Sequence, residues 1–243
     1  MFAGDSPYPF EMFSPSHWVA VGIVLLISAF LIYFRRVIRS NPILQKLLRR
    51  SLLFLLIATE STYHSRAILT GEWNRVDHLP LELCSLSTFM AIILLCTDNQ
   101  KLFRIFYFLG LFPAVVAIAT PVLFNGFPHI EYFRFFSQHL AIVCTVLFFI
   151  FVKNYRPRLR SVFFSFLCLN IISVFIILLN VRLDANYMFL NRPPAASEYY
   201  VWSTEQPYYL LNLEVVVFAV FLLSYVPFAL RKRNREREGQ VNV

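Results

Sequence analysis

The 243-residue sequence has little charge and little glycine. Charged residues make up 15% of it and six residues are glycine, whereas 58% are hydrophobic. Soluble domains carry about 25% charged residues, so this composition excludes a soluble globule. No glycine-rich phosphate loop, internal repeat or HExxH pair occurs. The sequence therefore predicts an all-α, polytopic membrane helix bundle, with residues 1–230 forming one transmembrane helical bundle domain.

Cysteine is also scarce, and its pattern excludes two kinds of site. The four cysteines are Cys84, Cys96, Cys144 and Cys168. They form no CxxC pair and lie within or at the edge of apolar runs, which argues against a disulfide framework and a structural zinc site. We expect neither a metal nor a cofactor. Residues 1–15 contain no Lys or Arg, so the basic region of a cleavable signal peptide is missing.

Seven apolar runs approach the length of about 20 residues that a spanning helix needs. We expect helices at 17–34, 47–69, 80–97, 102–123, 134–152, 161–181 and 208–230. The second and fourth runs contain polar residues or prolines, so six spans with one re-entrant segment is the alternative. Residues 231–243 form a basic cytosolic tail, which we expect to be disordered and attracted to the inner leaflet.

Lysine and arginine alternate between the segments that connect these runs. Seventeen of the 22 lie in the first, third and fifth connections and in the tail, and five lie elsewhere. The positive-inside rule then places the N-terminus outside the cytosol and the C-terminus inside it. The net charge of +8 is therefore interpreted as attraction to anionic lipid headgroups, and no nucleic-acid partner is expected.

Polar and ionisable side chains gather in the outer halves of the expected helices. The set comprises Glu60, His64, Glu82, Cys84, His139, Asn186, Tyr187 and Asn212. Each has a structural explanation on its own, as a packing residue, a pair within a helix or an interfacial group. Polar groups inside a membrane are costly, however, so their shared depth predicts one polar cavity near the outer leaflet, open either to lipid or to water.

Cys84 is the candidate nucleophile of this set. It lies about one turn into an expected helix, where the helix dipole favours a thiolate. His139 or His64 could accept its proton, and the Asn and Tyr side chains of the set, or Gln138, could donate to an oxyanion. Two alternatives stay open: a zinc-dependent membrane hydrolase that uses the Glu and His side chains, and a non-catalytic transporter or small-ligand binding protein.

Four motifs around these residues resemble a known family. They are HLPLELCS at 78–85, GFPH at 126–129, FFSQH at 135–139 and NYMFL at 186–190. In order and spacing they resemble the YwaF-like multi-pass membrane proteins of bacteria. That family is similar to a vertebrate transmembrane phospholipid acyltransferase that transfers polyunsaturated acyl chains onto ether lysophospholipids. It is distantly similar to membrane hydrolases of branched fatty-acid esters.

The resemblance implies an acyltransferase or transacylase that acts on membrane phospholipids or lysolipids. Cys84 matches the family's nucleophile and His139 its histidine base. The family pattern often has a histidine where this sequence has Glu82, which weakens the zinc alternative. The resemblance also implies a bacterial plasma membrane. The acyl donor, the acceptor and the oligomeric state are left open, and with water as acceptor the protein would be a lipase.

Overall fold

Helices make up nearly all of the structure, a computed structural model that describes residues 8–193 and 205–241, with side chains as far as Arg231. The elements are α1 (Pro15–Tyr33), α2 (Arg35–Ser40), α3 (Pro42–Leu69), α4 (Leu83–Thr97), α5 (Gln100–Ala119), α6 (Ile130–Leu147), the π-helix η1 (Phe148–Val152), α7 (Leu159–Leu183), the short 3-10 helix η2 (Tyr187–Phe189) and α8 (Tyr208–Val241). The described residues form no strand, and a single isolated bridge joins Pro9 to Asn125.

Capping residues explain where three of the long helices begin. Ser14 caps α1, Asn41 caps α3 and Asn99 caps α5, each through a side-chain oxygen that accepts from the first backbone N–H groups of its helix. Pro15 and Pro42 then occupy the first helical position, where a missing N–H has no cost. The Asn-Pro step at 41–42 therefore starts α3 five residues earlier than the apolar run predicts.

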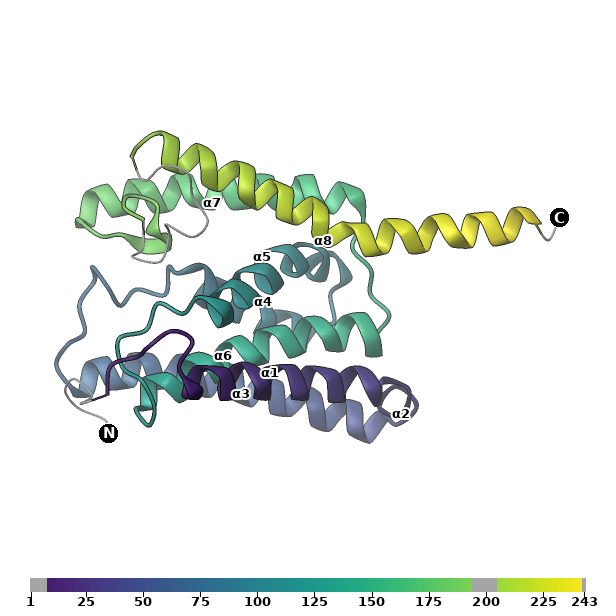
Figure 1. Cartoon of the computed structure of the whole chain (residues 1–243), viewed down its shortest axis with the longest axis horizontal. Coiled ribbons are helices and arrows are strands. Elements are labelled where there is room, and N and C mark those ends of the chain that lie inside the picture. The colour runs from purple at the N-terminus through teal and green to yellow at the C-terminus, as the bar shows by residue number, and fades with distance from the viewer. Residues whose placement is uncertain (1–7, 194–204, 242–243) are drawn as a thin grey trace.

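Helix α6 is the centre of the bundle. It packs against α1, α3, α4 and α5, and 78% of its most apolar stretch is buried, against 6% for α8. Helices α7 and α8 form a separate layer that packs on α5 (Figure 1). The residues that link α6 to every neighbour are therefore the best placed to hold a buried site.

Within the described residues, five helices are long and apolar enough to cross a membrane. They are α1, α5, α6 with η1, α7, and α8 as far as Arg231. Helix α4 is apolar but has 15 residues, which span about 22 Å. Helix α3 has 28 residues, enough for about 42 Å, but it is more polar. Five of the seven expected spans therefore meet both criteria, and the total of seven stays a prediction.

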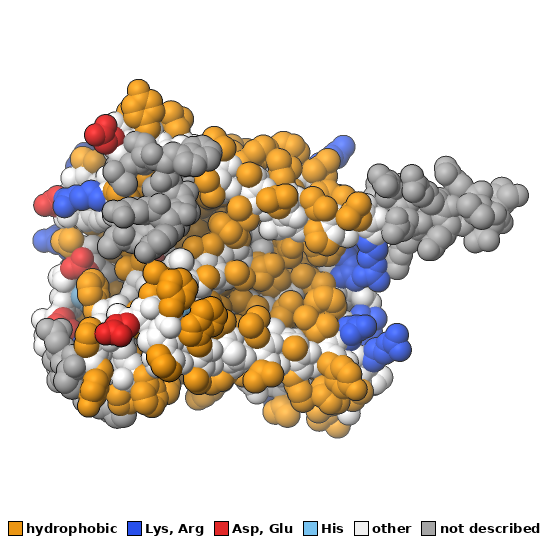
Figure 2. Space-filling model, in the orientation of Figure 1, with side chains coloured by type: hydrophobic (Ala, Val, Ile, Leu, Met, Phe, Trp, Pro, Cys, Tyr) orange, Lys and Arg blue, Asp and Glu red, His pale blue; other side chains and the backbone are white. Residues whose placement is uncertain are grey.

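Apolar side chains cover the outside of the bundle as well as its interior. Leu26 is 72% exposed, Val181 71% and Phe175 65%. Figure 2 shows apolar side chains across the middle of the visible face, between charged groups at the two ends. Such a surface suits lipid, so the chain is a polytopic helical membrane protein, as the sequence predicts.

The basic segments meet at one end of the bundle. Arg39 Nη2, on α2, donates to Asn154 Oδ1 at 2.9 Å. Asp98, after α4, lies 3.3 Å from Arg49 and 2.9 Å from Lys153. Figure 2 shows this end as a blue cluster beside the C-terminal helix. The basic segments that alternate along the sequence therefore lie together at one end of the bundle. The orientation of the bundle across the membrane stays a prediction.

Residues 8–10 fold over the opposite end of the bundle, which the charge pattern predicts to lie outside the cytosol; we term it the outer end. Phe10 N–H donates to the Phe124 carbonyl at 2.9 Å, and Gly126 N–H donates to the Tyr8 carbonyl at 2.9 Å. A Cβ at Gly126 would lie 2.9 Å from the Pro9 carbonyl oxygen, too close for any side chain. The glycine of the GFPH motif is therefore required by the close approach of these two segments.

Several helix limits differ from those expected. Helix α4 starts at 83 rather than 80, α6 starts at 130 rather than 134, and the first basic connection contains α2. Helix α8 continues to Val241 and projects beyond the bundle (Figure 1). The sequence predicts a disordered tail there, but its Arg, Lys and Glu residues are good helix formers. Residues 242–243 of that tail lie outside the described residues, and the domain division stays a prediction.

Candidate active site

Cys84 is the second residue of α4. A bent loop leads to Glu82, whose carbonyl oxygen accepts from Leu86 N–H at 3.0 Å and starts the helix. No side chain caps this helix, so the backbone N–H groups of its first turn have no partner from a cap. The sequence predicts Cys84 one turn further into the helix. The structure places the thiol nearer the N-terminus, where the helix dipole acts most strongly on a negative charge.

His139, on α6, faces this thiol. Its Nε2 is 3.1 Å from Cys84 Sγ, and its Nδ1 is 2.7 Å from the Phe135 carbonyl oxygen. A carbonyl only accepts, so Nδ1 carries the proton of the neutral ring and Nε2 presents a lone pair to the thiol. His139 is 2% exposed, whereas Cys84 is half-buried. A thiol, an imidazole and a carbonyl that orients the imidazole are thus aligned, which is the arrangement that a nucleophile and its base require.

Gln138 connects the helices on either side of this pair. Its Nε2 donates to Glu60 Oε2 on α3 at 2.9 Å and to Thr88 Oγ1 on α4 at 3.0 Å. Thr88 Oγ1 in turn donates to the Cys84 carbonyl at 2.9 Å. All of these groups except the cysteine are buried. A continuous hydrogen-bond chain therefore runs from α3 to the residue that carries the thiol.

Glu60 and His64 lie beside the pair without contacting the base. His64 Nε2 is 3.6 Å from Glu60 Oε1, so the two form the pair along one helix face that their spacing predicts. Glu60 reaches the site through Gln138, and no described hydrogen bond joins Glu60 or His64 to His139. Their expected support of the base is therefore indirect, through the position of α3 against α6.

Arg134 belongs to the same cluster, although its sequence position alone does not mark it. Its Nη1 donates to Gln138 Oε1 at 3.1 Å, and its guanidinium lies 4.7 Å from the centre of the Tyr63 ring. The Tyr63 hydroxyl donates to the Asp77 carbonyl at 2.9 Å. Arg134 precedes Gln138 by one helical turn, a spacing that could have indicated the contact. It places a positive charge on the α6 face that carries Gln138.

Tyr187 and Asn186 serve the connection between α7 and α8 rather than the thiol. The Tyr187 hydroxyl accepts from Leu79 N–H and donates to the Arg75 carbonyl, both at 2.9 Å. Burial raises the pKa of Tyr187. Asn186 Oδ1 accepts the backbone N–H groups of residues 191 and 192, and its Nδ2 donates to the Arg192 carbonyl at 3.0 Å. The Tyr187 hydroxyl and the Asn186 amide, which the sequence predicts as oxyanion donors, therefore donate to backbone carbonyls instead.

Glu82 and Asn212 are also placed away from the pair. Glu82 Oε2 accepts from Met188 N–H at 3.0 Å and so ties η2 to the start of α4. Burial raises the pKa of Glu82, which precedes the helix, to about 7, and the Met188 hydrogen bond partly opposes this rise. Asn212 lies on α8, and among the described contacts it makes no hydrogen bond to the cluster. The backbone N–H groups of α4 are left as the donors nearest the thiol in sequence.

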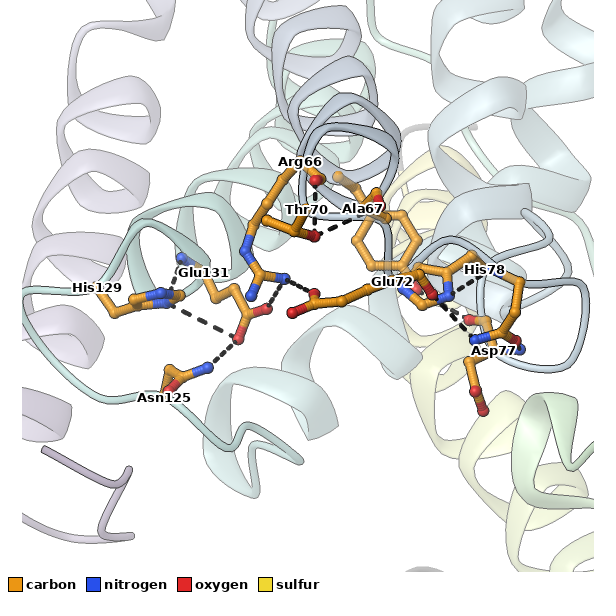
Figure 3. Close-up of polar contacts among 11 residues, drawn as sticks. Arg66, Ala67, Thr70, Glu72, Asp77, His78, Asn125, His129 and Glu131 are labelled. Atoms are coloured by element: carbon orange, nitrogen blue, oxygen red, sulfur yellow. Dashed lines mark hydrogen bonds and ion pairs between the residues drawn. The ribbon is translucent and has the colours of Figure 1, made fainter. Parts of the chain in front are cut away.

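A second group of polar contacts closes the outer end of α3 and α6 (Figure 3). Arg66 Nη1 lies 2.6 Å from Glu131 Oε1 and 3.3 Å from Glu72 Oε2. Glu131 Oε2 accepts from Asn125 Nδ2 at 2.8 Å and lies 3.9 Å from His129 Nδ1. This outer ion-pair group joins the end of α3 to the start of α6, the two helices that flank the site.

The candidate zinc ligands do not converge. Within the described residues no group of three His, Cys, Asp or Glu side chains could hold a metal ion. Glu82 faces η2, His139 faces the thiol, and only Glu60 and His64 pair with each other. The zinc alternative therefore has no donor set in this part of the chain.

The fold defines a polytopic helical membrane protein, and the thiol and imidazole aligned at the start of α4 are its candidate active site. A family model described as the TMEM164 family matches residues 12–225. The chain therefore belongs to the TMEM164 family, and the match covers every residue of the site. No curated protein and no solved structure matches the chain.

Proposed function

We propose that this protein is an integral membrane acyltransferase or transacylase that acts on membrane phospholipids and lysolipids. The observation that carries the proposal is the 3.1 Å contact between Cys84 Sγ and His139 Nε2, with the opposite ring nitrogen held by a carbonyl. Membership of the TMEM164 family supports a membrane protein with a lipid-related role. The sequence resemblance described above supports a bacterial plasma membrane as its location.

The first half-reaction would acylate the enzyme. His139 Nε2 takes the proton of Cys84 Sγ while the sulfur attacks the ester carbonyl carbon of a phospholipid. The backbone N–H groups of the first turn of α4 stabilise the oxyanion. When the carbon–oxygen bond to the glycerol breaks, the imidazolium returns the proton to the leaving oxygen. The products are a thioester on Cys84 and a lysolipid.

The second half-reaction would transfer the acyl chain. A hydroxyl of a lysolipid attacks the thioester, and His139 takes the hydroxyl proton. The carbon–sulfur bond then breaks, and the imidazolium gives that proton to the sulfur, which restores the thiol and releases the new phospholipid. Water in place of the lysolipid would make the same site a lipase. The exclusion of water from a site among apolar helices favours the lipid acceptor.

Thiol labelling in native membranes tests the activated cysteine. An alkyne-tagged, lipid-like thiol electrophile should label the wild-type chain rapidly and Cys84→Ala not at all. Loss of a general base typically slows such a step about 100-fold or more, so His139→Ala should label far more slowly. The matched control is Cys168→Ala, which removes another half-buried cysteine, on α7, and should leave the rate unchanged.

A lipid assay then tests the transfer itself. Membranes that contain the wild-type chain should move a labelled acyl chain from a phospholipid to an added lysophospholipid, and Cys84→Ser and His139→Gln should not. Labelling that is spread evenly over the four cysteines would instead favour a non-catalytic binding protein. Full transfer by the Cys84 and His139 variants would refute the mechanism.

A further inference from the structure

An open cavity of about 1020 Å³ lies at the basic end of the bundle, the end opposite the outer ion-pair group. Its wall contains five arginines from three parts of the chain: Arg39 on α2, Arg156, Arg158 and Arg160 around the start of α7, and Arg231 on α8. Tyr225, Phe228 and Leu159 form an apolar side of the same cavity. We define these residues as the arginine cavity.

Two of the arginines are held in place by the backbone. Arg39 Nη2 donates to the Phe151 carbonyl at 2.6 Å. Arg156 Nη1 donates to the Ile150 carbonyl at 2.7 Å, and its guanidinium lies 5.9 Å from the centre of the Phe228 ring. These contacts neutralise no charge, because carbonyls and rings carry none. They fix the side chains at the cavity before any ligand binds, which lowers the cost of binding.

Basic residues set the orientation of a membrane protein whether or not they are paired with acidic residues. That role does not explain why some basic residues at this end lie near a carboxylate and others do not. At the same end, Arg49 and Lys153 share the carboxylate of Asp98, at 3.3 Å and 2.9 Å. Within the described part of the chain, no carboxylate lies within ion-pair distance of Arg39, Arg158 or Arg160. Positive charge is thus neutralised beside the cavity and concentrated within it. The N-terminus of the 25-residue helix α7, whose N-cap residue is Arg158, adds to the positive potential.

We propose that the arginine cavity binds the headgroup of an anionic phospholipid, with its phosphates among the arginines and its glycerol and upper acyl chain against the apolar side. Arginine forks match phosphate oxygens in geometry and charge. Basic pockets between membrane helices on the cytosolic side bind such headgroups in general. The apolar side favours a lipid over a soluble polyphosphate. This site is separate from Cys84, and it does not depend on the proposed acyl transfer.

Native mass spectrometry of the full-length chain in detergent tests this site. The lipid probes are cardiolipin, with two phosphates, phosphatidylglycerol, with one, and zwitterionic phosphatidylcholine; inorganic pyrophosphate is the soluble probe. Cardiolipin should bind the wild-type chain most tightly, and phosphatidylcholine least. The double variant Arg158→Gln/Arg160→Gln should weaken cardiolipin binding about thirtyfold, from two lost basic contacts. Arg158→Lys/Arg160→Lys should keep most of it.

The matched control removes the same charge from the same end. Lys46 and Arg50 are exposed on α3 and do not line the cavity, so Lys46→Gln/Arg50→Gln should change cardiolipin binding less than about twofold. An equal loss in this control would mean diffuse surface attraction and would overturn the proposal. Pyrophosphate binding as tight as that of cardiolipin would also overturn it, in favour of a soluble ligand. Cys84→Ala should bind cardiolipin normally, which separates this test from that of the acyl transfer.

Discussion

Gln138 links α3 and α4 beside the residue that carries the thiol. Its amide holds the Glu60 carboxylate and the Thr88 hydroxyl at 2.9 Å and 3.0 Å. Replacing it by leucine, of similar size, leaves a buried carboxylate without its donor, which costs about 1–3 kcal/mol or more. We expect Gln138→Leu to lower the melting temperature and to slow the labelling of Cys84 about tenfold, because α4 loses its registration against α6.

A matched pair elsewhere in the bundle separates the two effects. Asn170 on α7 donates to Glu214 on α8 at 3.1 Å, another amide–carboxylate contact between two helices, but away from the thiol. Asn170→Leu should lower the melting temperature in the same way and leave the labelling rate of Cys84 unchanged. Equal slowing by both variants would show that labelling follows stability rather than the local hydrogen-bond chain.

At this scale the sequence predicts the contact between Cys84 and His139 but not its surroundings. The shared depth of polar groups in apolar helices singles out Cys84 with either His139 or His64, and the family resemblance selects His139. Tyr187 could not be assigned from sequence, because its hydroxyl is used by two backbone groups more than 100 residues away. The Phe135 carbonyl, which sets the tautomer of the base, has no sequence signal beyond the i, i+4 spacing.

Among the elements, the start of α6 depends on His129. This residue is the N-cap of α6, and its Nδ1 accepts from Glu131 N–H at 3.3 Å. Burial, chiefly, and the charge of Arg66 lower the pKa of His129, while Glu131 opposes them. A proton on Nδ1 would also remove the acceptor of the capping hydrogen bond. The folded chain therefore binds this proton less readily than the unfolded chain does.

The sign of the pH dependence follows from this lowered pKa. Between the folded and the unfolded pKa the unfolded chain carries more protons, so stability rises with pH there. His129 thus contributes stability above about pH 6.5, the usual pKa of histidine, which is lost as the pH falls below it. We expect the melting temperature to fall more between about pH 7.5 and pH 5.5 for the wild-type chain than for His129→Asn. Asparagine caps without titrating, and equal falls would contradict the prediction.

Helix limits could be predicted only where a local signal exists. Apolar runs locate all of the long helices, but the start of α3 depends on the Asn-Pro step and that of α6 on the His129 cap. The bent loop before α4 has no such signal, because Pro80 is equally compatible with a first helical position. Tertiary contacts decide it instead: the Tyr187 hydroxyl holds Leu79 N–H, and Glu82 reaches η2.

For the whole molecule, the number and direction of the spans decide which leaflet supplies the substrate. Helices α3 and α4 are the two that fall short in polarity or length. Two charged side chains of α3 have partners on α6, since Glu60 accepts from Gln138 and Arg66 pairs with Glu131, so α3 need not face lipid with them. We therefore expect both helices to cross, which gives seven spans and puts the two termini on opposite sides.

Reporter fusions measure this directly. A reporter enzyme that is active only outside the cytosol should be active when fused at the N-terminus or after Asn125, and inactive when fused after Val243. The reason is that 17 of the 22 Lys and Arg residues lie in the first, third and fifth connections and in the tail. The positive-inside rule places these segments in the cytosol. Activity at neither or at both termini would indicate an even number of spans. Activity only at the C-terminus would indicate the opposite orientation of the bundle in the membrane. Cys84 would then take its acyl donor from the inner leaflet.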